Sequence, residues 1–259
     1  MAANDLRALV AYRGLIRGLV QRDLTVKYKG SLLGVAWSLL HPLVMVAVYT
    51  LAFRYVVRVP IERFPLFLLS GLLPWMYFTS ALVAATSSIA DNGTLVRKVA
   101  FPRAVLPLAA VASALVQFIL MYTVLVPTAL VMGAGLSPTW LALLPVVVLQ
   151  TIFTAGLGLL MATAYVFLRD ARHLLDVAIQ VWFWLTPIVY AVSMAPEALR
   201  RWLRFNPMLH FVTAYQGIVT EHAVPSLGTF ALLTVLAAVS LALGWTVFGR
   251  AQKRFAEHV

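Results

Sequence analysis

Residues 104–168 read AVLPLAAVASALVQFILMYTVLVPTALVMGAGLSPTWLALLPVVVLQTIFTAGLGLLMATAYVFL, a tract of 65 residues without Asp, Glu, Lys or Arg. A helix needs about 20 apolar residues to cross the hydrocarbon core of a bilayer, so this tract is long enough to cross twice. Gly133, Gly135, Ser137 and Pro138 interrupt it near the middle, and such residues favour a turn. The tract therefore predicts two membrane-spanning helices joined by a tight hairpin.

Four further tracts lack charged residues over the length of a span. They cover residues 30–53, 64–90, 177–196 and 222–249. Of the 259 residues, 62% are hydrophobic and 11% are charged, whereas about 25% of the residues of a soluble domain are charged. We therefore predict an all-α integral membrane protein with six transmembrane helices, at 32–57, 65–89, 104–133, 139–167, 176–195 and 227–249.

The cations lie at the ends of the apolar tracts and indicate the orientation. With a cytoplasmic N-terminus, 14 Lys and Arg residues fall on the inside and 6 on the outside. Because cytoplasmic loops are enriched in these residues, both termini are expected in the cytoplasm. The net charge of +11 does not indicate a nucleic-acid partner, since such proteins gather their cations on one folded face.

Two segments are expected to lie at the membrane without crossing it. Residues 5–29 have apolar side chains at helical spacing and Arg residues on the opposite side, which is typical of an amphipathic helix at the cytoplasmic interface. Residues 196–226 include an uncharged stretch of only 16 residues that contains Asn206 and Gln216. This stretch is too short and too polar to span, so we expect a re-entrant external segment between spans five and six.

The sequence lacks the chemistry of several enzyme and carrier classes. It contains no Gly-Lys dipeptide, which a phosphate-binding loop for ATP would need. Within the predicted spans, Asp, Glu, Lys and Arg occur only at the ends. Ion-coupled carriers usually have ionisable residues in the interior of their spans. There is no cysteine, and no histidine stands at metal-ligand spacing from a carboxylate, so no metal site is expected. The energy for transport is expected to come from a separate subunit.

Four segments occur in an order that resembles a known family. They are RDLTVKYKGSLLGVAWSLLHPL (22–43), LVRKVAFPRAVLPL (95–108), LRDARHLLDVAIQVWFWLTPIVY (168–190) and NPM (206–208). Together they resemble the permease subunit of ABC-2 type transporters, in the branch that exports lipid-linked polysaccharides such as O-antigen, capsule or teichoic acid. The resemblance extends from about residue 10 to the C-terminus.

The resemblance implies a homodimer of six-span subunits in the bacterial inner membrane. Each subunit would dock on a separate ATP-binding-cassette subunit that binds ATP and Mg, so no cofactor is expected in this chain. The cytoplasmic loop 91–103 would carry the helix that couples the ATPase to transport, with the coupling residues Asp91, Arg97, Lys98 and Arg103. The external segment 196–226 would close the outer end of the path, with the gate residues Asn206, Pro207 and Met208.

A polysaccharide that slides through a path suits aromatic side chains, because they offer flat apolar faces for the C–H faces of sugar rings. The candidate substrate-path residues lie in predicted spans two, three and five: Trp75, Tyr77, Phe78, Tyr122, Trp182, Trp184 and Tyr190. Trp and Tyr also form belts at membrane interfaces, and that interpretation stays open for these residues.

The pyrophosphate of a lipid carrier would need cations at the cytoplasmic leaflet. Arg22, Lys27 and Lys29 lie where the amphipathic helix meets span one, and they are the candidate entry site. Attraction to the membrane surface explains these three cations equally well.

Two other functions stay open at this point. The first is an ABC-2 exporter of a drug, a lipid or another small amphiphile. The second is a membrane glycosyltransferase acting on a lipid-linked sugar, which would need a carboxylate as general base. The first external loop offers only Glu62, between Arg58 and Arg63, and a salt-bridged surface carboxylate is the more ordinary interpretation of that residue.

Overall fold

The computed structural model describes residues 11–29, 34 and 36–258, and every regular element in them is helical. In chain order these are α2 (Arg13–Tyr28), α3 (Ala36–Tyr49), η1 (Thr50–Val56), α4 (Phe64–Asp91), α5 (Gly93–Lys98), α6 (Val105–Val131), η2 (Pro138–Ala142), α7 (Leu143–Phe167), α8 (Ala171–Trp184), η3 (Val192–Met194), α9 (Glu197–Leu203), α10 (Pro207–Thr220), α11 (Leu227–Ala251), η4 (Gln252–Arg254) and α12 (Phe255–His258).

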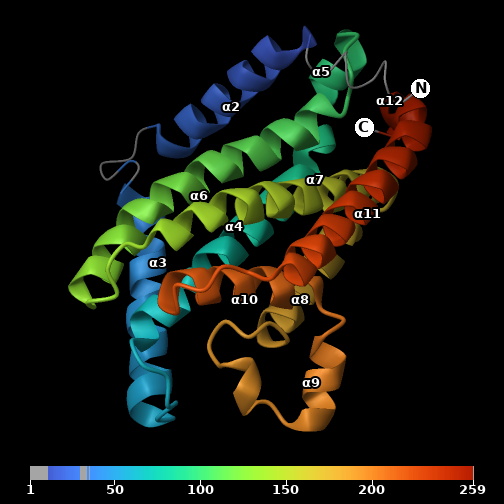
Figure 1. Ribbon diagram of the computed structural model, residues 1–259. Coiled ribbons are helices and arrows are strands. Elements are labelled where there is room, and N and C mark those ends of the chain that lie inside the picture. Colours follow the sequence, from blue (N-terminus) through green and yellow to red (C-terminus); the bar gives the residue numbers. More distant parts are fainter. Residues whose placement is uncertain (1–10, 30–33, 35, 259) are drawn as a thin grey trace.

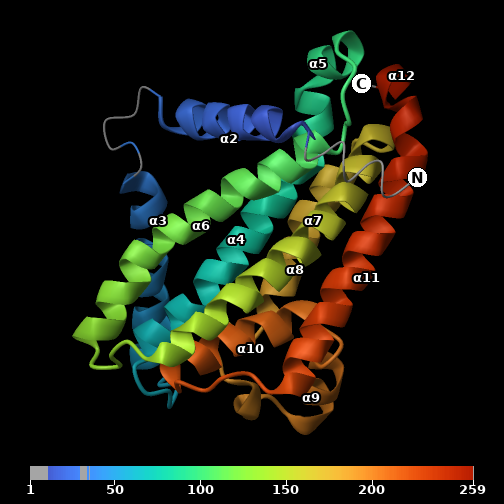
Figure 2. The same ribbon diagram turned by 45° about the horizontal axis from the view of Figure 1, so that its top comes forward.

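The long helices form one bundle with two distinct ends (Figures 1 and 2). The elements α2, α5 and α12 lie at one end, which we call the α2 end. The helix α9 lies at the opposite end, the α9 end. Along the chain, α3, α6 and α8 run from the α2 end toward the α9 end, whereas α4, α7 and α11 run back (Figure 1).

Within the described residues, five helical segments are long and apolar enough to cross a membrane: Ala36–Val56, Phe64–Asp91, Val105–Val131, Pro138–Phe167 and Leu227–Arg254. They correspond to predicted spans one, two, three, four and six, so the prediction of an all-helical membrane protein is confirmed. Residues 32, 33 and 35 of predicted span one lie outside the described residues. The predicted hairpin turn contains Gly133 with φ of 68°, a conformation that glycine adopts without steric cost.

The structure corrects the fifth predicted span, 176–195. The helix α8 begins earlier, at Ala171, and ends at Trp184, and the backbone from Leu185 to Ala191 is irregular. Pro187 has no backbone N–H and its ring clashes with the preceding turn, which explains why the helix stops. The 14 residues of α8 extend over about 21 Å, less than the ~30 Å hydrocarbon core. The helix α8 therefore does not extend over the whole of the predicted span, and by itself it is shorter than a membrane-spanning helix.

The central helix of the bundle is α4, which packs against α6, α7 and α10. In its most apolar window 78% of the residues are buried, compared with 11% in Ala36–Val56 and 22% in Leu227–Arg254. A helix that is apolar on all sides belongs in the core, and α4 occupies that position. The helix α10 joins this core, because Phe211, Val212 and Ile218 are fully buried.

The helix α2 covers the described part of the predicted amphipathic segment, of which residues 5–10 lie outside the described residues. Leu19 is buried in a cluster that includes Leu106 and Ala109 of α6, whereas Arg13 and Arg17 are exposed. Figure 2 shows that the axis of α2 is turned away from that of α3. The apolar face of α2 therefore packs on α6 and leaves its cations at the surface.

The helices α7 and α11 cross in very close contact. A Cβ atom on Gly156 would overlap the backbone of Ser240, and one on Gly244 would overlap the backbone of Gly156. The hydroxyl of Ser240 donates a hydrogen bond to the carbonyl oxygen of Phe153 at 2.8 Å. Small residues allow membrane helices to approach this closely and to gain packing and hydrogen-bond energy.

We predict that Gly244→Ala lowers the thermal stability of the purified protein, whereas Gly249→Ala on the same helix does not. The methyl group at position 244 forces two backbones apart, at a cost of about 1–3 kcal/mol. A Cβ at Gly249 meets no atom within 4 Å, and alanine has the higher helix propensity. Thermal unfolding in detergent measures the difference, and equal melting temperatures for the two variants would contradict the packing.

Candidate functional site

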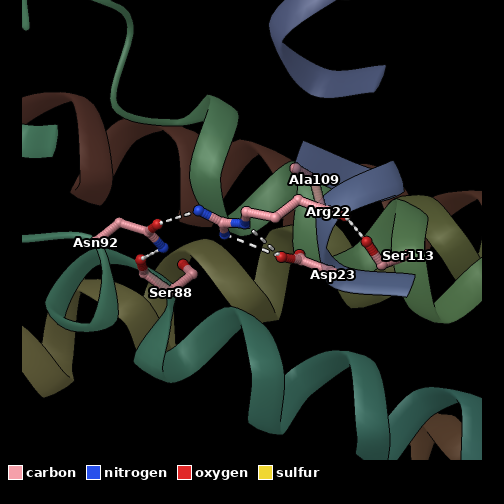
Figure 3. A network of polar contacts seen from close by, with 6 residues as sticks. All are labelled: Arg22, Asp23, Ser88, Asn92, Ala109 and Ser113. Carbon is pink, nitrogen blue, oxygen red and sulfur yellow. Dashed lines mark hydrogen bonds and ion pairs between the residues drawn. The ribbon is translucent and has the colours of Figure 1, made fainter. Parts of the chain in front are cut away.

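A polar groove lies between α2 and the adjoining ends of α4 and α6. It contains a cavity of about 530 Å³. Figure 3 shows that Arg22 donates to Oδ1 of Asn92 at 2.9 Å and forms an ion pair with Asp23 at 2.9 Å. The side-chain amide of Asn92 in turn donates to the Ser88 carbonyl oxygen at 2.8 Å. One guanidinium group therefore connects α2 to the C-terminal end of α4.

Lys27 connects the same helix to α6. Its ammonium group donates to Oε1 of Gln117, and partial burial lowers the pKa of this ammonium group below its ordinary value. Lys27, Ser80 and Gln117 line both the first cavity and a second one of about 860 Å³. The two cavities therefore adjoin at Lys27, and we call them together the α2 groove.

Two of the three predicted entry cations line the α2 groove. Arg22 lines the first cavity and Lys27 lines both. Lys29 is exposed and lines neither cavity. An anion in the first cavity would therefore lie near Arg22 and Lys27, with the carboxylate of Asp23 offsetting part of the charge of Arg22.

The second cavity extends into the bundle between four helices. Its further lining comes from Gly34 at the start of α3 and from Trp37, Ser38 and His41 of α3, Met76, Thr79 and Val83 of α4, Met121 of α6, and Asp176, Ile179 and Gln180 of α8. Asp91 lines the first cavity and Met76 the second, and α4 rises by about 22 Å between these two residues. The α2 groove therefore has polar side chains far from the α2 end of the bundle.

Three of the predicted substrate-path residues are buried in the core. Trp75, Tyr77 and Phe78 are 4%, 1% and 0% exposed. The Tyr77 hydroxyl donates to Oγ1 of Thr151 at 2.9 Å, and its ring stacks on Phe118 with 5.0 Å between centroids. These three side chains fill the core around α4 and cannot contact a substrate in this structure. The sequence places these aromatic residues in one predicted span, but it does not show which face of α4 is covered by other helices.

The other four predicted aromatic residues lie closer to the surface. Trp184 is 57% exposed, and the Tyr190 hydroxyl donates to the Trp184 carbonyl oxygen at 3.1 Å. Tyr122 is half-buried with its ring edge-on to Phe118. Trp182 is half-buried and faces the core, where it contacts the rings of Trp75 and Phe78.

Asn206 holds the broken end of α8 against the start of α10. Its Oδ1 accepts hydrogen bonds from the indole N–H of Trp182 at 2.7 Å and from the backbone N–H of Met208 at 3.0 Å. Its Nδ2 donates to the Leu185 carbonyl oxygen at 2.9 Å and to Oγ1 of Thr186 at 3.0 Å. Asn206 is thus the N-cap of α10 and also a partner for the irregular backbone.

Gln216, one of the buried polar residues of α10, completes this arrangement. Its side-chain amide donates to the Pro187 carbonyl oxygen at 2.9 Å. The two amides, Asn206 and Gln216, therefore satisfy carbonyl groups that the end of α8 leaves without helical partners. We call this set of contacts the amide clamp. The other two predicted gate residues support it from within α10, since Pro207 is its first residue and Met208 is fully buried.

The predicted coupling loop contains a helix, α5, and presents two of its cations. Arg97 and Lys98 are exposed, whereas Val96 is buried in the cluster that also contains Leu19 of α2 and Phe255 of α12. Asp91 is exposed at the end of α4. Packing of α5 into this cluster links the exposed cations mechanically to the α2 end of the bundle.

Two other residues of this loop make contacts within the protein. Arg103 is half-buried and donates from Nη1 to the Gln252 carbonyl oxygen, so it fixes the end of α11 instead of presenting a free cation. Asn92 precedes α5 but forms no capping hydrogen bond with it, because its side chain is engaged by Arg22 and Ser88.

Asp176 and Gln180 line the second cavity but were not among the predicted site residues. The available signal was their spacing, because Asp176, Gln180 and Trp184 follow one another at intervals of four along α8. Residues at such intervals share one side of a helix.

The His, Asp and Glu residues that bear on a metal site or on catalysis lie apart from one another in the described part of the chain. In the described part of the chain, no group of three His, Asp or Glu residues could hold a metal ion. Glu62 is exposed, and neither of the two ion pairs in the described residues involves it, so the predicted salt bridge with Arg58 or Arg63 is absent from this structure.

Comparison with known proteins gives consistent matches over almost the whole chain. Residues 14–220 match the family described as ABC-2 type transporter. The chain is 39% identical to an O-antigen export system permease protein (RfbA) of Myxococcus xanthus, over 98% of both chains. It is 30% identical to a protein of the same name from Klebsiella pneumoniae, over 92% of both. It is 23% identical to the polysialic acid transport protein KpsM of Escherichia coli, over 87% of this chain and 91% of that one.

We predict that Gln216→Leu destabilises the protein more than Thr213→Val does on the same helix. The leucine leaves the Pro187 carbonyl without its partner, and a buried unsatisfied group costs about 1–3 kcal/mol. The hydroxyl of Thr213 bonds only to carbonyl groups of α10 itself, so its loss should cost less. Thermal unfolding of the purified variants measures both effects. A Gln216→Leu protein as stable as the wild type would contradict the amide clamp.

Proposed function

This chain belongs to the ABC-2 type transporter family, and from that premise we propose that it is the permease subunit of an exporter for a lipid-linked polysaccharide. The observation that supports this most strongly is its 39% identity, over 98% of both chains, to a protein named as an O-antigen export permease. The polysialic acid transport protein aligns over 91% of its own length as well. Both named relatives handle polysaccharides, which favours this cargo over a drug or another small amphiphile.

The energy would come from a separate ATPase subunit. The sequence contains no Gly-Lys dipeptide, so it lacks the glycine-rich phosphate-binding loop that ends in Gly-Lys-Ser or Gly-Lys-Thr. ATP and Mg would be bound by that partner, whose closure moves the permease. Two permease subunits and two ATPase subunits would form the working complex.

The complex would lie in the bacterial inner membrane with the α2 end in the cytoplasm. The excess of cations predicted for that side supports this orientation. The crossing formed by α8 and the irregular backbone after it would be the fifth of six, because the chain passes from the α2 end toward the α9 end there (Figure 1). Both chain termini would then be cytoplasmic.

The α2 groove would accept the head of the lipid carrier. Arg22 and Lys27 lie where a pyrophosphate at the cytoplasmic leaflet could meet them, and charge-assisted hydrogen bonds to phosphate are strong. Lys29 would attract anionic lipid from outside the groove. Membrane lipids would surround the exposed apolar faces of α3 and α11.

The glycan would then move along a path between two copies of this chain. The helix α8 supports this, because Trp184 is exposed on it and Tyr190 is bonded to the same turn. Trp182 and Tyr122 would stabilise the wall from behind. The amide clamp, which includes Asn206, would shape the external end of that path, and α10 would close it between export cycles.

Coupling would run through α5. Arg97 and Lys98 are exposed at the α2 end, where a cytoplasmic ATPase would dock, and Val96 anchors the helix in the protein. A rigid helix can transmit a rigid-body movement to the elements it packs against. Asp91 flanks the docking surface, and Arg103 keeps the end of α11 in place behind it.

We predict that deletion of the gene removes the polysaccharide from the cell surface while lipid-linked glycan accumulates inside the cell. Loss of a glycosyltransferase would stop synthesis instead, and loss of a drug exporter would leave surface glycan unchanged. Glycan staining of intact cells and analysis of extracted lipids give the two readouts. Intact surface polysaccharide, or an absence of internal glycan, would contradict the proposed function.

We predict that Arg97→Glu combined with Lys98→Glu leaves the protein in the membrane but reduces export at least tenfold. Reversing both charges repels the surface that the cations would contact, and like charges at an interface cost several kcal/mol. Co-purification of the ATPase subunit and surface glycan measure the effect. The matched control is Arg200→Glu with Arg201→Glu on α9, at the opposite end of the bundle, which should keep the ATPase bound. Full export by the α5 variant would disprove the coupling role.

A further inference from the structure

The second cavity of the α2 groove is lined by polar side chains that the binding of a pyrophosphate alone would not need. His41 and Gln180 line it and are exposed, and neither side chain has a hydrogen-bond partner among the described residues. Polar side chains at membrane depth are costly unless water or a polar ligand satisfies them. A cavity of about 860 Å³ lined this way therefore indicates a polar occupant.

The helix α8 extends this polar lining toward Trp184. Asp176 and Gln180 line the cavity, and Trp184 follows one turn later on the same side of the helix. Asp176 forms an ion pair with Arg172 at 3.5 Å, and its side chain is 45% exposed. Its carboxylate is therefore held in place and still open to a hydrogen-bond donor. The cavity and the exposed indole belong to one continuous face.

The wall formed by α3 contributes an aromatic surface. Trp37 lines the cavity and is 55% exposed. Carboxylate oxygens accept hydrogen bonds and amides both donate and accept, which matches the hydroxyl groups of a sugar ring. The indole matches the apolar face of such a ring.

We propose that the second cavity is a saccharide subsite that binds the sugar residues next to the pyrophosphate of the lipid carrier. Asp176 and Gln180 would bond to sugar hydroxyls, Trp37 would stack on a ring, and Lys27 would stand between the sugars and the pyrophosphate in the first cavity. Its volume lies within the roughly 300–1,000 Å³ of small-molecule sites. This inference rests on the proposed export function and adds the recognition of sugar to it.

The test compares two probes on the complex of this chain with its ATPase subunit in lipid nanodiscs. One probe is polyprenyl pyrophosphate without sugar, and the other is glycan-bearing polyprenyl pyrophosphate extracted from the host. Gln180→Leu should raise the Kd of the glycan-bearing probe about tenfold and change that of the sugar-free probe less than twofold. Trp37→Ala should act in the same way, and Trp37→Phe should restore most of the affinity. Lys27→Gln should weaken both probes.

Control variants and outcomes separate this inference from the function it rests on. Gln21→Leu replaces an exposed amide of α2 that lines neither cavity, and it should leave both Kd values unchanged. A Gln180→Leu complex that binds both probes as the wild type does, or weakens both equally, would overturn the saccharide subsite alone. Wild-type protein that binds neither probe would overturn the proposed function itself. Thermal unfolding of each variant complex shows whether a loss of binding reflects a loss of fold.

Discussion

The structure depends on how it satisfies backbone groups where α8 is broken. A buried carbonyl group that has no hydrogen-bond partner costs about 1–3 kcal/mol. Pro187 ends the helix, and the carbonyls of Leu185 and Pro187 are bonded by the side chains of Asn206 and Gln216. Irregular backbone is tolerated at this place because α10 supplies the missing donors. The burial of α10 in the bundle follows from the same requirement.

The bundle has a packed core and a groove at its side. In the core, α4 packs against α6, α7 and α10, with aromatic contacts around Tyr77 and a close crossing of α7 and α11 at Gly156. The helices α2, α3 and α8 contribute residues to the lining of the α2 groove, and in the proposed function they form the surface that binds the substrate. A short α8 fixed at its far end by the amide clamp can present a polar face at one end and Trp184 at the other.

Sequence alone predicted the helices whose apolar tracts exceed the thickness of a bilayer. It also predicted the amphipathic nature of α2. It named Asn206 and Trp182 as candidate site residues, but it could not show that their side chains are hydrogen-bonded to each other. It did not show where α8 begins and ends, because hydropathy measures length and polarity and does not locate the last helical residue before a proline. It did not show that Trp75 and Phe78 are buried, because all sides of α4 are apolar and no periodicity distinguishes a covered face from an open one. The cavity around Gln180 required the packing of four helices, which spacing within one helix does not contain.

We propose that this chain is a conduit whose movement is driven by the ATPase of another subunit. The most direct measurement uses proteoliposomes with purified components and follows ATP hydrolysis and the transfer of glycan-bearing polyprenyl pyrophosphate across the bilayer. We expect neither ATP hydrolysis nor glycan transfer with this chain alone. Once the ATPase subunit is added, we expect ATP-dependent transfer. Nucleotide hydrolysis by this chain alone, or transfer driven by an ion gradient without the partner, would contradict it.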